Sequence, residues 1–141
     1  MADTKNRHNG RVRPLILSVD DEQDVTDLVQ FNLTRAGYEV ITAANGREAL
    51  ACVSNRRPDL ILLDLMLPDI DGFGVCELLR REPATAAIPI VILTAWATPD
   101  ARSLGLELGA LDYLTKPFSP RELTSRVKRL LSLRSSSPAI A

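Results

Sequence analysis

The sequence predicts an α/β protein with a parallel β-sheet covered by helices on both faces. Short apolar runs alternate five times with segments of helical period, and such strict alternation is typical of consecutive strand–helix units. The three central runs have no polar residue at alternate positions. Strands that are covered on both faces show this pattern because neither side meets water. With 141 residues, the chain has the length of one ordinary domain.

The expected strands span residues 15–19, 39–43, 60–64, 90–94 and 112–115. The helices between them are indicated by spacing and by start and stop signals. The apolar stripe of the first helix consists of Val25, Leu28, Val29, Leu33 and Ala36, and Gly37 ends that helix. Segments 45–55 and 73–82 predict the second and third helices, and a fourth begins at 98–99 and ends near residue 109.

The last helix has the clearest start. Ser119-Pro120-Arg121-Glu122 combines a capping box with proline at the first helical position. Its apolar stripe consists of Leu123, Val127, Leu130 and Leu131. We expect one domain over residues 14–133, a flexible N-terminal tail over 1–13, and a flexible tail or the start of a linker over 134–141.

Composition excludes several classes of function. A net charge of −1 argues against direct contact with nucleic acid or a membrane surface. The two cysteines form no metal-spaced cluster and are typical of reduced residues in a cytoplasmic protein. No signal peptide is visible, and no apolar run approaches the length of a transmembrane helix.

Residues with reactive side chains stand at the ends of the expected strands. Asp20 and Asp21 follow the first strand, Asp64 and Thr94 end the third and fourth, and Lys116 follows the fifth. Ligands of parallel α/β sheets bind outside the carboxyl ends of the strands, so we expect these five side chains to share one rim. Asp64 follows four apolar residues. Burying a lone carboxylate there costs several kcal/mol unless a cation pairs with it.

This set of groups suits phosphoryl chemistry. Clustered carboxylates raise one another's pKa unless a cation lies among them, and oxygen ligands suit Mg²⁺, with Mn²⁺ as an alternative. A carboxylate beside such an ion can act as a nucleophile and form an aspartyl phosphate. Lys116 and Thr94 can supply the positive charge and the hydrogen bond that the phosphoryl group needs.

Four motifs contain these residues: VDDE at 19–22, LLDLMLPDIDG at 62–72, ILTAWA at 92–97 and DYLTKPFSP at 112–120. Their order and spacing over residues 14–133 resemble the response-regulator receiver domains of two-component signalling, and the motifs are most similar to OmpR/PhoB-type receivers. The resemblance implies a flavodoxin-like (βα)5 fold whose five parallel strands have the order 2-1-3-4-5.

The resemblance also implies the roles of the rim residues. Asp64 would accept a phosphoryl group from a sensor histidine kinase or a phosphotransfer protein, and Lys116 would pair with that group. Asp20, Asp21, Asp64 and the backbone carbonyl of Met66 would hold Mg²⁺. The chain's one histidine, at position 8, lies in the expected tail and is not placed to be the phosphodonor, so the donor is another protein.

Further residues are implied to respond to phosphorylation. Thr94 would move to hydrogen-bond the phosphoryl group, Tyr113 would swing inward behind it, and a cis peptide bond would follow Lys116. Met66 and Trp96 would flank the path of the water that hydrolyses the phosphoaspartate, while the small Ala95 leaves room for the phosphoryl group. Since neither large side chain orients water strongly and both exclude it, a long-lived phosphoaspartate is expected.

A dimer that forms on phosphorylation is implied through the fourth helix, fifth strand and fifth helix. The residues suited to its cross-dimer ion pairs are Arg102 with Glu122, Asp112 with Arg126, and Glu107 with Lys128. Leu111 departs from the acid often found beside Asp112. A solvated charged face is the simpler alternative, because exposed ion pairs are individually worth little.

Each assignment has a simpler alternative. Asp20 and Asp21 could only cap the first helix, Thr94 could be an ordinary strand residue, Tyr113 a packed aromatic residue, and Trp96 a surface residue without a role. Two other functions also stay open. An aspartyl-nucleophile phosphatase would need its nucleophile after the first strand, and a scaffold receiver would bind partners without being phosphorylated. The chain is either a single-domain regulator or the receiver part of a longer protein.

Overall fold

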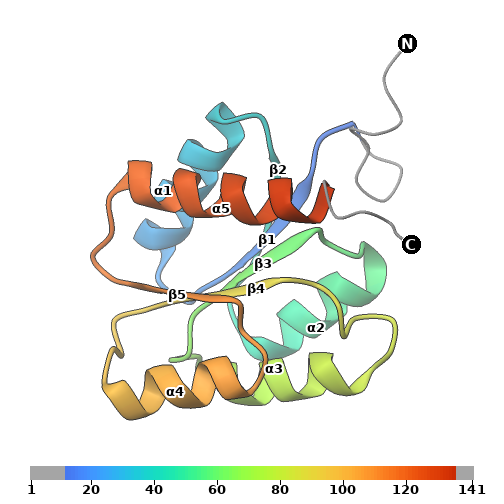
Figure 1. Ribbon diagram of the computed structural model, residues 1–141, viewed down its shortest axis with the longest axis vertical. Helices are drawn as coiled ribbons and strands as arrows, with labels where there is room; N and C mark the ends of the chain where they lie inside the picture. The colour runs from blue at the N-terminus through green and yellow to red at the C-terminus, as the bar shows by residue number, and fades with distance from the viewer. Residues whose placement is uncertain (1–11, 136–141) are drawn as a thin grey trace.

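The computed structural model describes residues 12–135, which form a five-stranded parallel sheet (Figure 1). The strands are β1 (Leu15–Val19), β2 (Glu39–Ala43), β3 (Leu60–Leu63), β4 (Ile90–Thr94) and β5 (Asp112–Thr115). Their order is β2-β1-β3-β4-β5, and every neighbouring pair is parallel. All residues of β1, β3 and β4 are buried. The predicted fold class and strand order are therefore confirmed.

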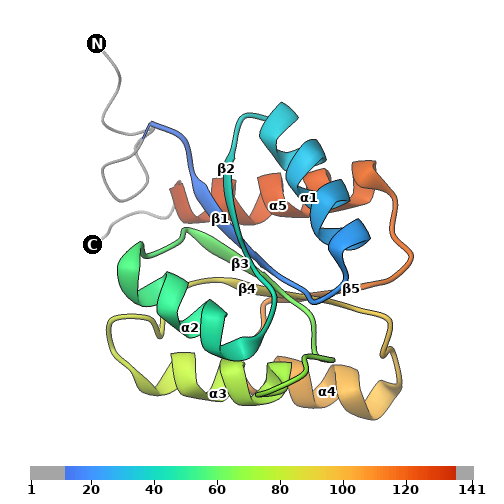
Figure 2. The same cartoon turned by 180° about the vertical axis from the view of Figure 1, so that it is seen from behind.

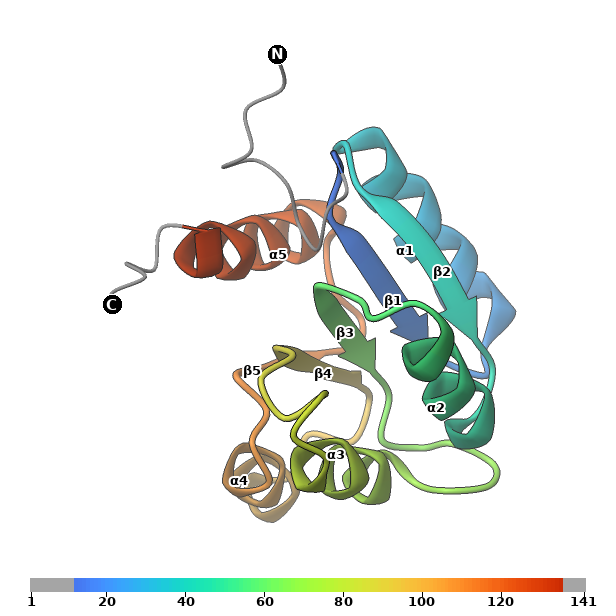
Figure 3. The same cartoon turned by 90° about the vertical axis from the view of Figure 1, so that its right-hand side faces the viewer.

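Five helices cover the two faces of this sheet, and Figure 3 shows both layers. They are α1 (Gln23–Arg35), α2 (Gly46–Asn55), α3 (Gly72–Arg81), α4 (Pro99–Glu107) and α5 (Pro120–Ser135). Helices α1 and α5 lie on one face, and α2, α3 and α4 lie on the other (Figures 1 and 2). Each layer has its own apolar core, with Val29 and Leu33 of α1 in one and Val75 and Leu79 of α3 in the other.

Side-chain caps begin four of the helices. Asn45 accepts a hydrogen bond from the Glu48 N–H at the start of α2, and Asp71 and Thr98 do the same for α3 and α4. The predicted start of α5 is confirmed, because the Ser119 hydroxyl accepts from the Glu122 N–H at 3.0 Å. Such caps satisfy backbone donors that have no partner inside the helix.

The elements differ from the prediction in a few places. Leu28, expected on the apolar stripe of α1, is 40% exposed, since the side of α1 facing the core is centred on Val29 and Leu33. Ala36 is the residue that caps α1, and Gly37 follows in the left-handed conformation with a φ of 101°. The last helix continues to Ser135, two residues past the limit of 133 expected for the domain. The predicted tails at 1–11 and 136–141 lie outside the described residues.

Two expectations from composition bear on the described part of the chain. Cys52 and Cys76 are free thiols. Over residues 12–135, no helix combines the length and the apolar character needed to cross a membrane.

Candidate functional site

The site lies where β1, β3, β4 and β5, four neighbours in the sheet, come to their carboxyl ends. Backbone hydrogen bonds continue the sheet one residue past its strands and fix the residues there. The Asp64 N–H donates to the Val19 carbonyl at 3.0 Å, and the Lys116 N–H donates to the Thr94 carbonyl at 2.9 Å. The structure therefore brings Asp20, Asp64, Thr94 and Lys116 to one rim, as the sequence predicted.

Three carboxylates converge on this rim. One oxygen from each of Asp20, Asp21 and Asp64 lies within 4.8 Å of the other two. Asp20 and Asp64 are buried, whereas Asp21 is exposed to solvent. A pocket of carboxylate oxygens with one open side can hold a divalent cation that keeps part of its water, which is the preference of Mg²⁺.

Lys116 neutralises part of this negative charge. Its ammonium lies 2.8 Å from Asp20 Oδ2, 3.0 Å from Asp64 Oδ2 and 2.7 Å from Glu22 Oε1. Burial alone would lower the pKa of Lys116, but the hydrogen bonds that its ammonium donates to these three carboxylates outweigh burial and raise the pKa above its usual value. Lys116 is therefore a permanent cation at neutral pH. The predicted cis peptide bond between Lys116 and Pro117 is also confirmed.

Glu22 is a partner of Lys116 that the sequence does not predict. It stands in the VDDE motif beside the two aspartates, but strand and helix patterns do not predict where a side chain in the connecting turn will point. Its contact adds a third carboxylate to one ammonium group.

Asp20 has two roles in this geometry. Its Oδ1 accepts a hydrogen bond from the Glu22 N–H at 2.9 Å, next to the first residue of α1, while its Oδ2 pairs with Lys116. Burial is the main reason that its pKa is raised, and the nearby charge of Asp64 raises it further against the hydrogen bonds that lower it. Lys116 alone does not balance the negative charge of the rim, so the donor set fits a divalent cation.

Thr94, Trp96 and Tyr113 form a connected group beside the carboxylates. Thr94 is fully buried, and its hydroxyl oxygen accepts from the Trp96 N–H at 3.3 Å. Tyr113 is also buried, and its hydroxyl donates to the Trp96 carbonyl. In the segment after β4, both backbone polar groups of Trp96, the N–H and the carbonyl, are therefore hydrogen-bonded to side chains.

Apolar side chains form one wall of the site. Met66, Ala95 and Trp96 line a hollow of about 840 Å³ together with Asp21. Trp96 is 42% exposed, and its ring meets the edge of Phe73 at the start of α3, with 5.6 Å between centroids. The indole therefore packs against the start of α3 and borders the hollow beside the site. Sequence patterns do not predict the Phe73 contact, because it joins the loop after β4 to the start of α3, which is distant in the chain.

The loop that follows Asp64 is fixed by close packing. A Cβ atom on Gly72 would lie 2.5 Å from the Asp64 carbonyl oxygen and 2.7 Å from the Leu65 Cα atom, so only glycine fits there. The Met66 N–H in turn donates to Asp64 Oδ1 at 3.1 Å. These contacts orient the Asp64 carboxylate.

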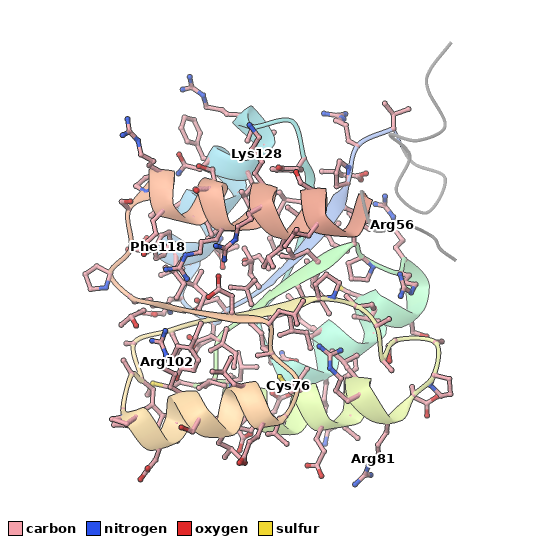
Figure 4. All side chains as sticks on the ribbon, in the orientation of Figure 1. Arg56, Cys76, Arg81, Arg102, Phe118 and Lys128 are labelled. Atoms are coloured by element: carbon pink, nitrogen blue, oxygen red, sulfur yellow. The ribbon has the colours of Figure 1, made fainter. Side chains whose placement is uncertain are left out.

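The residues expected on a dimer face lie on α4, β5 and α5. Arg126 pairs with Asp112 at 2.8 Å and with Glu122 at 3.2 Å within the same chain. The Arg102 guanidinium lies over the ring of Tyr113, 5.4 Å from its centroid. Glu107 is exposed at the end of α4. Lys128 points toward the α1 side of α5 (Figure 4).

A doubly wound sheet with clustered carboxylates, a lysine and a threonine at its rim defines the class of signalling receivers. The chain belongs to the response regulator receiver domain family of two-component systems, whose sequence profile matches residues 16–128. It is 53% identical over 116 residues to the alkaline phosphatase synthesis transcriptional regulatory protein PhoP of Bacillus subtilis. Over 116 residues it is 48% identical to the phosphate regulon transcriptional regulatory protein PhoB of Pseudomonas aeruginosa.

Solved structures agree with this assignment. A CheY-like receiver domain protein of Methanospirillum hungatei matches with a TM-score of 0.84 at 30% identity, over 89% of this chain and 98% of that protein's chain. A chemotaxis protein of Vibrio cholerae matches with a TM-score of 0.79 at 37% identity, over 83% and 98%. The two regulators PhoP and PhoB are longer. The match covers 82% of this chain but only 48% of PhoP and 51% of PhoB.

Proposed function

We propose that the protein is a phosphorylation-activated switch in which Asp64 accepts a phosphoryl group from a sensor histidine kinase or a phosphotransfer protein. The observation that carries the proposal is the position of Asp64. It is a buried carboxylate, 3.0 Å from a lysine ammonium and next to two further aspartates. A buried carboxyl group paired with a lysine in this way is a candidate nucleophile.

In the proposed reaction, an oxygen of the Asp64 carboxylate attacks the phosphorus atom of the donor phosphohistidine. A P–O bond forms as the P–N bond breaks, and the electron pair of that bond stays on the imidazole nitrogen. The product is an acyl phosphate on Asp64. Lys116 lies beside the acceptor and pairs with the transferred oxygens, and the Thr94 hydroxyl donates to one of them.

The cation for this site would be held by Asp20, Asp21, Asp64 and the Met66 carbonyl. The donor set fits Mg²⁺, and Mn²⁺ is an alternative with the same oxygen preference. Bound there, the ion would screen the repulsion between the carboxylate and the phosphoryl oxygens. Asp21 is the exposed member of the set, so ion exchange does not require the fold to open.

We further propose that the phosphoryl group changes the surface formed by α4, β5 and α5. Movement of Thr94 would also displace Trp96 and Tyr113, because hydrogen bonds join the three residues. Tyr113 in turn lies under Arg102 on that surface. As a consequence, phosphorylation would produce a weak symmetric dimer through this face. Arg126 would exchange its acidic partners, or share them, across the interface.

A separate enzyme or an inert scaffold fits the site less well. The proposed nucleophile, Asp64, follows β3, whereas a phosphatase with an aspartyl nucleophile would carry that aspartate after the first strand. A scaffold would have no need of a lysine shared among three carboxylates. The protein would catalyse only its own phosphorylation and dephosphorylation, in the cytoplasm, without direct contact between this chain and nucleic acid.

A direct test is incubation of the purified protein with phosphoramidate and Mg²⁺, followed by intact-mass measurement. We expect a mass increase of one phosphoryl group that disappears with a chelator. Turnover of a generic phosphate ester under the same conditions would support the enzyme reading, and an unchanged mass would support the scaffold.

A further inference from the structure

A second hollow lies on the other side of α5, between that helix and the turn from α1 to β2. It has a volume of about 470 Å³, and its lining residues are Ala36, Tyr38, Arg121, Thr124, Ser125 and Lys128. None of the carboxylates or the lysine at the phosphorylation site belongs to this lining. The hollow is therefore a separate feature of the molecule.

The sequence of α5 explains why its polar lining gathers on one side. Residues 121, 124, 125 and 128 recur at helical spacing and share one face of the helix. The buried stripe of Leu123, Val127 and Leu130 lies beside that face and fixes its direction. As a result, the side chains of Arg121 and Lys128 both border the space in front of Tyr38, and Figure 4 shows Lys128 on this edge of α5.

The charge of the hollow is positive and uncompensated. Its lining contains an arginine and a lysine but no acid. The nearest acids along the same elements bind other cations: Glu39 is held by Arg56 at 2.8 Å, and Glu122 is held by Arg126 at 3.2 Å. Within residues 12–135, neither Arg121 nor Lys128 takes part in the ion pairs that the structure contains.

Two further polar groups of the lining, those of Tyr38 and Ser125, can donate hydrogen bonds to a ligand, whereas the Thr124 hydroxyl already donates to the carbonyls of Pro120 and Arg121. Burial raises the pKa of Tyr38, so its phenol stays protonated and is a donor at neutral pH. Ser125 adds an exposed hydroxyl. Three carbonyls near the end of α1 are already occupied: Asn32 accepts from Ala36, Leu33 accepts from Ala36 and Tyr38, and Thr34 accepts from Gly37. The negative end of α1 is thus largely satisfied and opposes an anion only weakly.

We propose that this hollow binds the phosphate group of a small molecule. Two cations two helical turns apart, with a phenol and a hydroxyl between them, match a compact anion with several acceptor oxygens. The volume is within the range of small-ligand sites and exceeds what a phosphate group alone requires. Free phosphate and a phosphomonoester both offer the phosphate oxygens that the lining recognises. They differ in that only the phosphomonoester has an organic part that could fill the rest of the hollow.

The test is a titration of the ¹⁵N-labelled protein followed by amide chemical shifts, at constant ionic strength and with a chelator present so that Asp64 takes up no phosphate. One arm adds inorganic phosphate and the other adds glycerol phosphate. We expect saturable shifts at Tyr38, Arg121 and Ser125 in at least one arm. Tighter binding of glycerol phosphate identifies an organic phosphate as the ligand, and equal or tighter binding of inorganic phosphate identifies the free anion.

Variants of α5 and of the facing turn between α1 and β2 make the test specific. The double variant Arg121→Gln with Lys128→Gln should weaken binding at least tenfold, and Tyr38→Phe should weaken it about threefold. The control is Arg129→Gln, which removes one positive charge from α5 at a residue that pairs with Asp112 and should leave the affinity within twofold. Linear, non-saturating shifts in both arms would overturn the proposal, and so would equal losses in the control and the double variant. The spectra themselves show whether each variant is folded.

Discussion

Lys116 and Asp64 form an ion pair of 3.0 Å across 52 residues of chain. The same ammonium also contacts Asp20 and Glu22, so one positive charge serves three carboxylates. Both aspartates are buried. The metal-free site is therefore rich in negative charge, and this excess has consequences for stability, metal binding and reaction.

The first prediction concerns the stability of the metal-free protein. Asp20→Asn should raise its melting temperature by roughly 3 °C, because the amide oxygen can still accept from Lys116 while one buried negative charge is removed. The control is Mg²⁺ addition, which should stabilise the wild type and leave the variant nearly unchanged. A variant that melts below the wild type without metal would contradict this reading.

The pH dependence of the stability difference between the wild type and Asp20→Asn follows from the raised pKa of Asp20. When the folded pKa of an acid exceeds its unfolded value, the folded state binds the proton more tightly, and stability is lost as pH rises through the folded pKa. The stability difference between Asp20→Asn and the wild type should therefore be largest at neutral pH and shrink below the ordinary carboxyl range. Urea denaturation at several pH values, with chelator present, measures it.

The second prediction concerns Arg80, which joins α3 to two loops, the one between α3 and β4 and the one between α4 and β5. Its guanidinium donates to the carbonyls of Ala86, Ile88 and Gly109 at 2.8–3.0 Å, and burial lowers its pKa. Arg80→Met should destabilise the fold by about 2–3 kcal/mol, because the carbonyls lose their partner. The adjacent Arg81, 69% exposed in its side chain and paired only at 3.5 Å with Glu77, is the control. Arg81→Met should change the free energy of unfolding by less than about 0.5 kcal/mol in the same urea titration.

Much of this architecture was predictable from the sequence, for reasons visible in particular residues. Asp64 and Thr94 were assigned to one rim because apolar strands end directly before or at them, and parallel strands end on the same edge. Glu22, Phe73 and Arg80 were not predicted. Their contacts depend on the conformation of turns and on long-range packing, which strand and helix periodicities do not encode. The prediction that Leu28 lies on the buried face of α1 was wrong, because the spacing of apolar residues does not indicate how wide the buried face of a helix is.

The third prediction concerns the lifetime of the phosphoaspartate. Met66 and Trp96 form an apolar wall beside the acid, and neither holds water by strong hydrogen bonds. Met66→Asn combined with Trp96→Glu should shorten the lifetime about tenfold, which corresponds to about 1.4 kcal/mol of barrier. Loss of phosphate from the purified phosphoprotein is followed over time. Leu78→Asn, an exposed residue of α3, is the control and should leave the rate unchanged. Equal rates for the double variant and the wild type would contradict the assignment.

The fourth prediction concerns self-association. Wild-type protein should sediment as a monomer and form a weak dimer after phosphorylation, with less dimer at high salt. Arg126→Glu should prevent the dimer, because it removes the partner of Asp112 and Glu122. Arg81→Glu on α3 changes charge equally at a distant helix and should leave the dimer intact. A phosphorylated wild type that stays monomeric at high concentration would refute this prediction.

The central claim is that Asp64 is the phosphoacceptor, and the most direct measurement locates the phosphoryl group on the chain. The protein is phosphorylated with phosphoramidate and Mg²⁺, the acyl phosphate is trapped by borohydride reduction, and peptides are sequenced by mass spectrometry. We expect one modified residue, Asp64, and no labelling of Asp64→Asn. The control Asp59→Asn should be labelled normally if it folds, since Asp59 accepts a hydrogen bond from the Leu15 N–H at the opposite end of the sheet. Modification at another residue, or undiminished labelling of folded Asp64→Asn, would contradict the central claim.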